Sequence, residues 1–409
     1  MRSSRDGELI CGMYSLSLAL WLITGAGSSM AADWSRWRGP NGDGISREKD
    51  WNPKSLAGGA KTLWAVDVGE GYAAASVSGK RVFTMGNIDD QDRVCCLDAD
   101  TGKEIWHRTY ACKKGDHPGP RATPVLDGDR LYTLSREGDV YCLNSADGKV
   151  LWQKNIMQGT GVENIGWGLS SSPVVAGDLV LVNAGRAGVA LNKTTGSIVW
   201  SEPGKGGYAS PVPYESGGKP CAAIFGQNAV CGVTVADGKL LWSFPWETRY
   251  DVNAPDPIVA GDRVFISSGY GRGCALLRIE AGEAKPVWEN QRLRCHFSSC
   301  VLIDGFIYGI DGNAGNGTLR CLDLESGLEK WSKETGFGAL MAADGKLIVL
   351  TEKGTLIVAQ AQPTGYTEIA RAEGAVPVKG KCWTMPVLCG GRIYCRDSAG
   401  ALVCIDVGK

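Results

Sequence analysis

Residues 96–106 read CLDADTGKEIW, and this pattern of a small residue, a polar turn and a closing tryptophan returns along most of the chain. Counted from Trp64, the closing tryptophans lie 42 to 48 residues apart. So regular a period is typical of a repeat protein. The recurring motif residues are Asp98, Gly102 and Trp106; Gly148 and Trp152; Gly196 and Trp200; Gly238 and Trp242; and Asp323, Gly327 and Trp331.

Short runs of alternating apolar residues separated by glycine turns fill each period, as expected for β-strands. Residues 172–175 and 179–182, joined by the turn at Gly177-Asp178, illustrate the first two strands. The Cys-Leu-Asp core supplies a third strand, and the run that ends in tryptophan supplies a fourth. Four antiparallel strands in each period predict the blade of a β-propeller.

Eight blades are expected, because third strands fall near residues 96, 142, 190, 232, 276, 321, 357 and 404. The last of them has no fourth strand after it, whereas residues 61–66 form a fourth strand with no blade before it. Shared between the two ends, one blade would leave no unpaired edge. The sequence therefore predicts an all-β, eight-bladed propeller over residues 61–409, preceded by a lead-in over residues 33–60.

The first 32 residues have the order of a secretory signal. An apolar run, Tyr14 to Ile23, is followed by small residues and by Ala31-Ala32, which resembles a cleavage site. The run is too short to span a bilayer, and Cys11 precedes it, so this cysteine is not placed for lipid attachment after cleavage. We expect an exported protein, periplasmic or extracellular, with no transmembrane segment in the mature chain.

Several function classes are disfavoured by composition and motif spacing. Lysine plus arginine (43) balances aspartate plus glutamate (44), so nucleic acid is not an expected partner. The three histidines form no pair at metal-ligand spacing, and we expect no metal site and no catalytic residues. Gly269 to Gly273 is interpreted as a hairpin turn, not a dinucleotide loop. Residues 311–316 are interpreted as a turn in preference to a calcium loop.

Fourteen of the 15 cysteines follow the signal. One repeat position holds Cys96, Cys142, Cys321 or Cys404 in some copies and Ala190 or Gly232 in others. A position that accepts these residues is a small buried site, where cysteine packs as a small hydrophobe. Bridges between Cys221 and Cys231, and between Cys389 and Cys395, are left open because each pair lies on neighbouring strands.

The repeat motif resembles that of the pyrroloquinoline-quinone (PQQ) type propeller family, which includes quinoprotein alcohol dehydrogenases and BamB-like exported bacterial proteins. The resemblance covers about residues 60–409, and Trp34 to Pro40 is similar to the lead-in of exported members. It implies that the motif tryptophans pack against the neighbouring blade. Blades five and seven are degenerate, with Ile369 where a tryptophan is expected.

Two functions follow from this resemblance. The first is a non-enzymatic, BamB-like scaffold that binds a protein or cell-envelope partner through the propeller face, with no cofactor. The alternative is a PQQ-dependent dehydrogenase that holds PQQ and calcium on the axis. Family enzymes often carry a bridge between adjacent cysteines, but Cys95 and Cys96 lie on one strand, where adjacent side chains point to opposite faces.

The residues just before each innermost strand are expected to converge on the central channel. Aromatic and arginine side chains are those most enriched at binding hot spots. They predict an axial platform for a protein or, as a second alternative, for a carbohydrate or polymer; the competing interpretation is that they only fill the channel mouth. These residues are Tyr72, Arg121, Trp167, Tyr208, Asn253, His296, Phe337 and Trp383.

Overall fold

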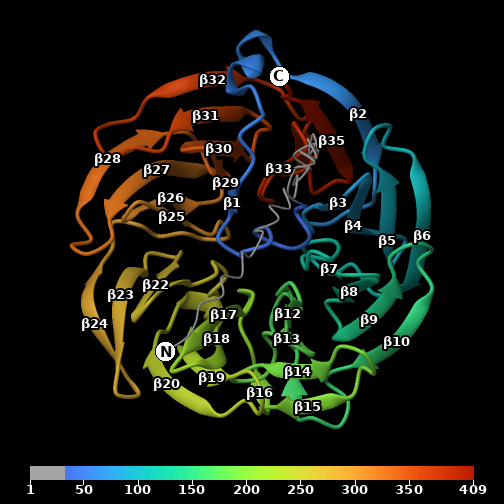
Figure 1. Cartoon of the computed structure of the whole chain (residues 1–409), viewed down its shortest axis with the longest axis vertical. Coiled ribbons are helices and arrows are strands. Elements are labelled where there is room, and N and C mark those ends of the chain that lie inside the picture. The colour runs from blue at the N-terminus through green and yellow to red at the C-terminus, as the bar shows by residue number, and fades with distance from the viewer. Residues whose placement is uncertain (1–32) are drawn as a thin grey trace, which may run out of the picture. The chain divides into compact units, whose positions relative to one another are not determined.

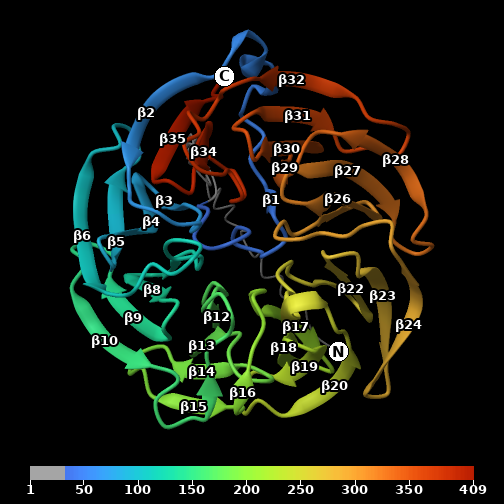
Figure 2. The same ribbon diagram turned by 180° about the vertical axis from the view of Figure 1, so that it is seen from behind.

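The computed structural model describes residues 33–409, in which eight blades of four antiparallel strands form a ring and one blade carries an additional strand (Figures 1 and 2). The predicted all-β, eight-bladed propeller is therefore confirmed. The predicted signal, residues 1–32, lies outside the described residues. In blades 1 to 6 the strands follow the chain from the axis outward, so the first strand is innermost and the fourth strand is at the rim.

The first four blades have bounds that match the predicted repeats. Blade 1 contains β3 (Ser76–Ser78), β4 (Arg81–Ile88), β5 (Gln91–Asp98) and β6 (Glu104–Ala111), and blade 2 contains β7 (Val125–Asp127), β8 (Arg130–Leu134), β9 (Asp139–Asn144) and β10 (Val150–Asn155). Blade 3 contains β12 (Val174–Ala176), β13 (Leu179–Val182), β14 (Val189–Asn192) and β15 (Ile198–Ser201), and blade 4 contains β17 (Val212–Ser216), β18 (Lys219–Phe225), β19 (Ala229–Thr234) and β20 (Leu240–Pro245). Outside the blades, β11 (Val162–Glu163) pairs with β16 (Gly204–Lys205).

The remaining blades complete the ring. Blade 5 contains β21 (Ile258–Ala260), β22 (Arg263–Ser268), β23 (Gly273–Glu280) and β24 (Glu283–Asn290), and blade 6 contains β25 (Val301–Ile303), β26 (Phe306–Asn313), β27 (Asn316–Asp323) and β28 (Glu329–Glu334). Blade 7 contains β29 (Gly338–Ala343), β30 (Lys346–Thr351), β31 (Leu356–Gln360) and β32 (Glu368–Ala372), and blade 8 contains β33 (Val387–Cys389), β34 (Arg392–Arg396), β35 (Ala401–Asp406) and β2 (Lys61–Asp67). Every predicted third strand is the third strand of its blade.

The two ends of the chain share blade 8, as predicted. Strand β2 pairs antiparallel with β35, and Trp64 lies opposite Cys404. The lead-in also contributes a strand that the sequence did not indicate. Strand β1 (Ile45–Ser46) pairs in parallel with β29 and adds a fifth strand to the inner edge of blade 7. Blades 7 and 8 are thus each joined by a strand from the N-terminal part of the chain.

The motif tryptophans bridge neighbouring blades. Trp64 Nε1 donates a 2.9 Å hydrogen bond to the carbonyl of Ala99 in blade 1, and its ring covers Gly102. Equivalent bonds of 2.7–3.0 Å run from Trp106, Trp152, Trp200, Trp288 and Trp331 to Ser145, Lys193, Val235, Leu324 and Gln362. We call these six residues, with Trp242, the girdle tryptophans.

Trp242 departs from this pattern because its neighbour lacks the motif turn. Its Nε1 donates to the Tyr214 hydroxyl of its own blade at 2.9 Å. In blade 5, β23 and β24 are joined by the short turn Ala281-Gly282, so no motif glycine is available for the indole. The expectation for blade 7 was one residue off: Ala370, not Ile369, lies opposite Val358 at the tryptophan position, beside a bulge in β32.

The small cysteine position lies opposite the girdle tryptophans and is fully buried. Cys96 faces Trp106 across β5 and β6. Cys95 packs in a different hydrophobic cluster from Cys96, which confirms that the adjacent pair points to opposite faces. The two bridges left open are not supported by strand register. Cys221, Cys231, Cys389 and Cys395 lie opposite Thr234, Ile224, Arg392 and Val403, respectively.

Two glycine-rich segments are turns between strands, as predicted. Residues 269–272 connect β22 to β23 in a hairpin. Of the predicted turn at residues 311–316, only residues 314–315 connect the strands, because residues 311–313 belong to β26 and residue 316 to β27. Asp311 pairs with Arg294 at 2.7 Å and Arg320 at 3.1 Å, so its carboxylate is already engaged by cations. Neither of the 3-10 helices found between residues 33 and 409, η1 (Pro53–Gly58) and η2 (Arg249–Asp251), is long and apolar enough to cross a membrane.

Candidate functional site

The lead-in crosses the centre of the ring, where the blue trace in Figure 1 passes between the inner strands. Trp37 Nε1 donates a 2.7 Å hydrogen bond to Oδ2 of Asp256, which precedes β21. Arg38 is 3% exposed and donates from Nη2 to the carbonyl of Cys300 at 2.8 Å. The lead-in is therefore fastened to blades 5 and 6, and it brings an indole to the axis.

Asp256 is the acidic residue on the axis, and its oxygens are already used. Burial raises the pKa of its carboxyl, while Arg38, 4.0 Å away, acts in the opposite direction. Oδ1 accepts the backbone N–H of Ser210 at 2.7 Å, and Oδ2 accepts Trp37 Nε1. This carboxyl group therefore joins the lead-in to blades 4 and 5, with both oxygens occupied by donors.

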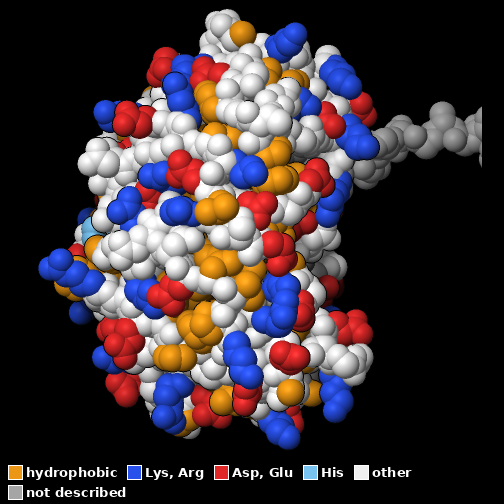
Figure 3. Space-filling view, turned by 90° about the vertical axis from the view of Figure 1, so that its left-hand side faces the viewer, with side chains coloured by type: hydrophobic (Ala, Val, Ile, Leu, Met, Phe, Trp, Pro, Cys, Tyr) orange, Lys and Arg blue, Asp and Glu red, His pale blue; other side chains and the backbone are white. Residues whose placement is uncertain are grey.

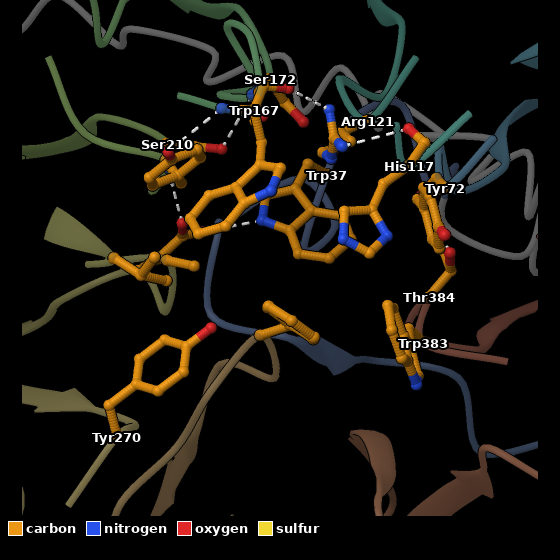
Figure 4. Close-up of a pocket in the computed structure, with 16 residues that line it drawn as sticks. Trp37, Tyr72, His117, Arg121, Trp167, Ser172, Ser210, Tyr270, Trp383 and Thr384 are labelled. Atoms are coloured by element: carbon orange, nitrogen blue, oxygen red, sulfur yellow. Dashed lines mark hydrogen bonds between the residues drawn. The ribbon is translucent and has the colours of Figure 1, made fainter. Parts of the chain in front are cut away.

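Aromatic side chains surround a cavity of about 160 Å³ on the axis (Figure 4). Tyr72 and Trp383 stack with ring centroids 5.7 Å apart, and Phe297 lies 5.0 Å from Trp383. We call this cavity the axial pocket. It is lined by Trp37, Tyr72, His117, Arg121, Trp167, Ser170, Ser172, Tyr208, Ser210, Val252, Ala254, Asp256, Tyr270, Phe297, Trp383 and Thr384.

Arg121 places a cation in the wall of the axial pocket. Its Nη1 donates to the carbonyl of Trp167 at 2.6 Å and its Nη2 to the carbonyl of His117 at 3.1 Å. Burial lowers the pKa of this guanidinium to about 10, so the group stays charged at neutral pH. Among residues 33–409, no carboxylate lies within ion-pair distance of it. The pocket therefore combines aromatic walls with a cation whose charge is not balanced by a neighbouring acid.

The two histidines near the pocket are neutral at pH 7. Burial, together with the charge of Arg121, lowers the pKa of His117. Burial lowers the pKa of His296 to about 4, and its ring stacks on Phe297 with centroids 3.6 Å apart. His296 thus supports the ring of Phe297 from behind and adds no charge to the cavity.

Five of the eight predicted rim residues line the axial pocket: Tyr72, Arg121, Trp167, Tyr208 and Trp383. The other three do not. Asn253 is fully buried, and its amide donates to the carbonyls of Gly226 and Gln227. Phe337 is 1% exposed and, like His296, packs against Phe297. A binding role for the five lining residues stays a prediction.

Sequence reasoning missed several residues of the pocket, above all Trp37, His117, Tyr270 and Phe297. Trp37 belongs to the lead-in, outside the repeat, so the period gave no indication of its position. Phe297 directly follows the predicted His296, and the two rings stack, but only Phe297 lines the pocket. Tyr270 lies in the hairpin turn between β22 and β23, where positive φ places its ring toward the axis.

The donor set on the axis does not fit PQQ with calcium. Calcium takes six to eight oxygen ligands, largely carboxylates. Asp256 already accepts two N–H donors, and the buried Asn253 faces the interior of blade 4. Nowhere in the described chain do three or more His, Cys, Asp or Glu side chains gather as a metal site. Cys95 and Cys96 lie within blade 1 and are not among the pocket residues.

The outer edge of the propeller carries mixed charge. Figure 3 shows basic and acidic side chains intermixed over one side, with hydrophobic side chains between them. Charged side chains of the described chain form surface pairs, such as Arg371 with Glu368 and Lys61 with Asp406. This side of the described chain has no continuous basic stripe of the kind that binds nucleic acid.

Comparison with solved structures identifies the fold. BamB from Moraxella catarrhalis superposes with a TM-score of 0.61 at 13% identity, covering 85% of this chain and 97% of that one. Quinohemoprotein alcohol dehydrogenase from Comamonas testosteroni superposes with a TM-score of 0.70 at 14% identity, covering 94% of this chain and 82% of the other. At such identities both show the shared propeller alone.

Sequence comparison separates the two functions that share this fold. BamB of Yersinia pestis is 26% identical over 353 residues, which is 83% of this chain and 77% of the relative. BamB of Escherichia coli K12 is 26% identical over 310 residues, which is 69% of this chain and 73% of the relative. The family described as outer membrane protein assembly factor BamB matches residues 54–116 and 111–333. These matches support the BamB-like scaffold over the dehydrogenase, and the chain belongs to the BamB family.

Proposed function

We propose that this protein is an exported scaffold that binds a protein of the cell envelope through the propeller face that carries the axial pocket. The relatives are named as factors of outer membrane protein assembly, which supports a protein of that assembly route as the partner. The observation that carries the proposal is the axial pocket itself, where aromatic walls surround the unbalanced charge of Arg121.

The chemistry of the pocket defines what the partner presents. Tyr72, Trp167 and Trp383 offer apolar ring surfaces, so an aromatic or aliphatic side chain fits between them. Arg121 keeps guanidinium N–H groups beyond those used by the two carbonyls, since the side chain has five donors. A carboxylate beside the apolar group would satisfy them with charge-assisted bonds. The proposed partner segment is therefore acidic and apolar.

The scaffold is proposed to work without PQQ or calcium. The engaged oxygens of Asp256 support this, because no free carboxylate is left in the pocket for a cation. A thermal-shift titration with PQQ, with and without calcium, tests it. We expect no shift at saturating cofactor; a calcium-dependent rise in Tm would instead show ligand binding to the native state and return the dehydrogenase to consideration.

Site-specific photo-cross-linking in cells tests the partner. A photoreactive residue replaces His117, which is exposed at the pocket, or Leu328, which is 54% exposed in the turn between β27 and β28. We expect His117 to cross-link to an outer membrane protein or an assembly factor, and Leu328 to give a weaker product. Equal products at both positions would contradict binding through the axial face.

Two substitutions then assign the role of the cation. Arg121→Gln should reduce the cross-link at His117, because the amide retains hydrogen bonding but loses the charge. Arg278→Gln is the matched control, since Arg278 is half-exposed on β23 and, within residues 33–409, forms an ion pair with Asp262 alone. A product that Arg121→Gln leaves unchanged would show that the pocket cation does not contribute. Competition by an acidic polysaccharide, but not by an acidic peptide, would favour the carbohydrate alternative.

A further inference from the structure

Two buried cysteines lie side by side in the segment that links blades 5 and 6. Cys295 Sγ and Cys300 Sγ are 3.3 Å apart, and the residues are 0% and 2% exposed. Other buried cysteines contact different groups: Cys274 Sγ donates to Asn290 Oδ1, and Cys112 Sγ to the carbonyl of Lys113. The 295–300 pair differs from these two cysteines in having a direct contact between its sulfurs.

The backbone on each side of the pair is fixed. The N–H of Cys295 donates to Ser267 Oγ at 3.0 Å, and residue 295 bridges Gly312 of blade 6. The carbonyl of Cys300 accepts Arg38 Nη2. Strand β26 makes room for the sulfurs at Gly309, where a Cβ would lie 2.6 Å from Cys300 Sγ and 3.2 Å from Cys295 Sγ. The fold therefore holds both thiols in one small space.

We propose that Cys295 and Cys300 form a disulfide in the exported protein. A disulfide has an S–S distance of about 2.05 Å, so the sulfurs need to approach by only about 1 Å. Two thiols lose two protons and two electrons as the S–S bond forms, and a disulfide-bearing oxidant of the compartment takes them up, becoming two thiols. Disulfides persist in exported proteins for this reason. The proposal rests on the proposed export of the chain and is independent of the partner.

The disulfide closes a six-residue loop that carries part of the axial pocket. Between the cysteines lie His296 and Phe297, which stack on each other, and Ser299, whose Oγ accepts the N–H of Asp256 at 2.9 Å. Phe297 lines the pocket and lies 5.0 Å from the ring of Trp383. The bond restricts the loop in the unfolded chain, and in the folded protein it fixes the wall that presents Phe297.

Peptide mapping tests the bond directly. The protein is recovered from the exported fraction, denatured, alkylated and digested with trypsin, which releases residues 295–320 as one peptide with only these two cysteines. We expect this peptide to be unalkylated and lighter than the dithiol by two hydrogen atoms. Chymotryptic cleavage after Phe297 should leave its two halves joined until reduction. The peptide 273–278, which carries Cys274, is the internal control and should be alkylated.

A second arm separates failure of the bond from failure of export. Protein recovered from the cytoplasm is treated with oxidised glutathione and mapped in the same way, and we expect the same loss of two hydrogen atoms. Reductant should lower Tm of the oxidised protein by a few degrees, with no change in the Cys295→Ala/Cys300→Ala variant. Full alkylation of residues 295–320 in exported protein overturns the proposal, as does full alkylation after glutathione treatment.

Discussion

Trp37 donates a hydrogen bond of 2.7 Å to Asp256, a residue 219 positions further along the chain. The bond ties the lead-in, which is not part of any blade, to the start of β21 on the axis. Asp256 also accepts the N–H of Ser210 and so connects blades 4 and 5. The floor of the axial pocket is thus formed by a segment outside the repeat and depends on one buried carboxyl group.

Asp256→Asn should destabilise the protein through hydrogen bonding. The amide has one accepting oxygen, so either Trp37 Nε1 or the N–H of Ser210 faces an NH₂ group in a buried site. An unsatisfied buried donor costs about 1–3 kcal/mol, measured by denaturant unfolding. Trp37→Phe removes one of the two donors. The double variant should therefore lose less unfolding free energy than the sum of the losses in the two single variants. Simple additivity would show that the bond does not couple these residues.

Gly102→Ala should cost more than Gly128→Ala. Both glycines have positive φ, +71° and +62°, so both substitutions carry the backbone penalty of about 1–2 kcal/mol. Only at Gly102 would the new Cβ lie 2.7 Å from Trp64 Cδ2, whereas nothing lies within 4 Å at Gly128. Overpacking typically adds about 1–3 kcal/mol. Equal losses in the free energy of unfolding would contradict the close packing of the indole on the motif turn.

The fold could be predicted because one sequence pattern recurs along the chain, with degenerate copies in blades 5 and 7. The glycine turns and the tryptophans define the blade, and the unmatched strands at the two ends specify closure through β2 and β35. Strand β1 could not be predicted, since Ile45-Ser46 is too short for an alternating pattern and its partner, β29, lies almost 300 residues away. Blade 5 departed locally because its turn is shortened at Ala281-Gly282.

The candidate site was only partly predictable. The repeat indicates which residues approach the axis, but the side-chain direction depends on local backbone and on competing partners. Asn253 turns away because buried carbonyls accept its amide, and His296 lies behind Phe297. Trp37 reaches the axis through tertiary contacts of the lead-in, for which no local pattern exists. The pocket is assembled from segments of seven blades and the lead-in, so its full lining can be known only from the three-dimensional arrangement.

Arg396→Met should weaken the contact between blades 8 and 1. Arg396 is 2% exposed and donates to the carbonyls of Ala73 and Gly69 and to Thr84 Oγ1 at 2.8–3.0 Å. Without the guanidinium the carbonyl of Gly69 loses this donor, and the carbonyl of Ala73 keeps only the Thr84 hydroxyl. An unsatisfied buried acceptor costs about 1–3 kcal/mol. Hydrogen exchange should rise in β4 and β35 but not in β18 of blade 4. An equal rise in exchange throughout the ring would show that the contact between blades 8 and 1 does not open independently of the other blades.

Asp92→Asn should stabilise the protein at neutral pH. Burial raises the pKa of Asp92 to about 6, and its Oδ2 has no hydrogen-bond partner among residues 33–409. An unfolded aspartate has a pKa of about 3.9, so the folded state binds more protons between these values, and stability falls as pH rises from 4 to 6. The full loss, up to about 3 kcal/mol, is present above pH 6. The amide avoids it while Asn87 Nδ2 still donates to Oδ1.

Denaturant unfolding at several pH values measures this effect. The variant should exceed the wild type at pH 7.5, and the difference should disappear near pH 4, where both side chains are neutral. Asp406→Asn is the control, and it should lower the free energy of unfolding at pH 7.5. Lys61 lowers the pKa of Asp406, so the charge of this carboxylate is favourable in the folded state. A variant of Asp92 that is less stable at pH 7.5 would mean that the buried carboxylate is stabilised by a group that the asparagine cannot replace.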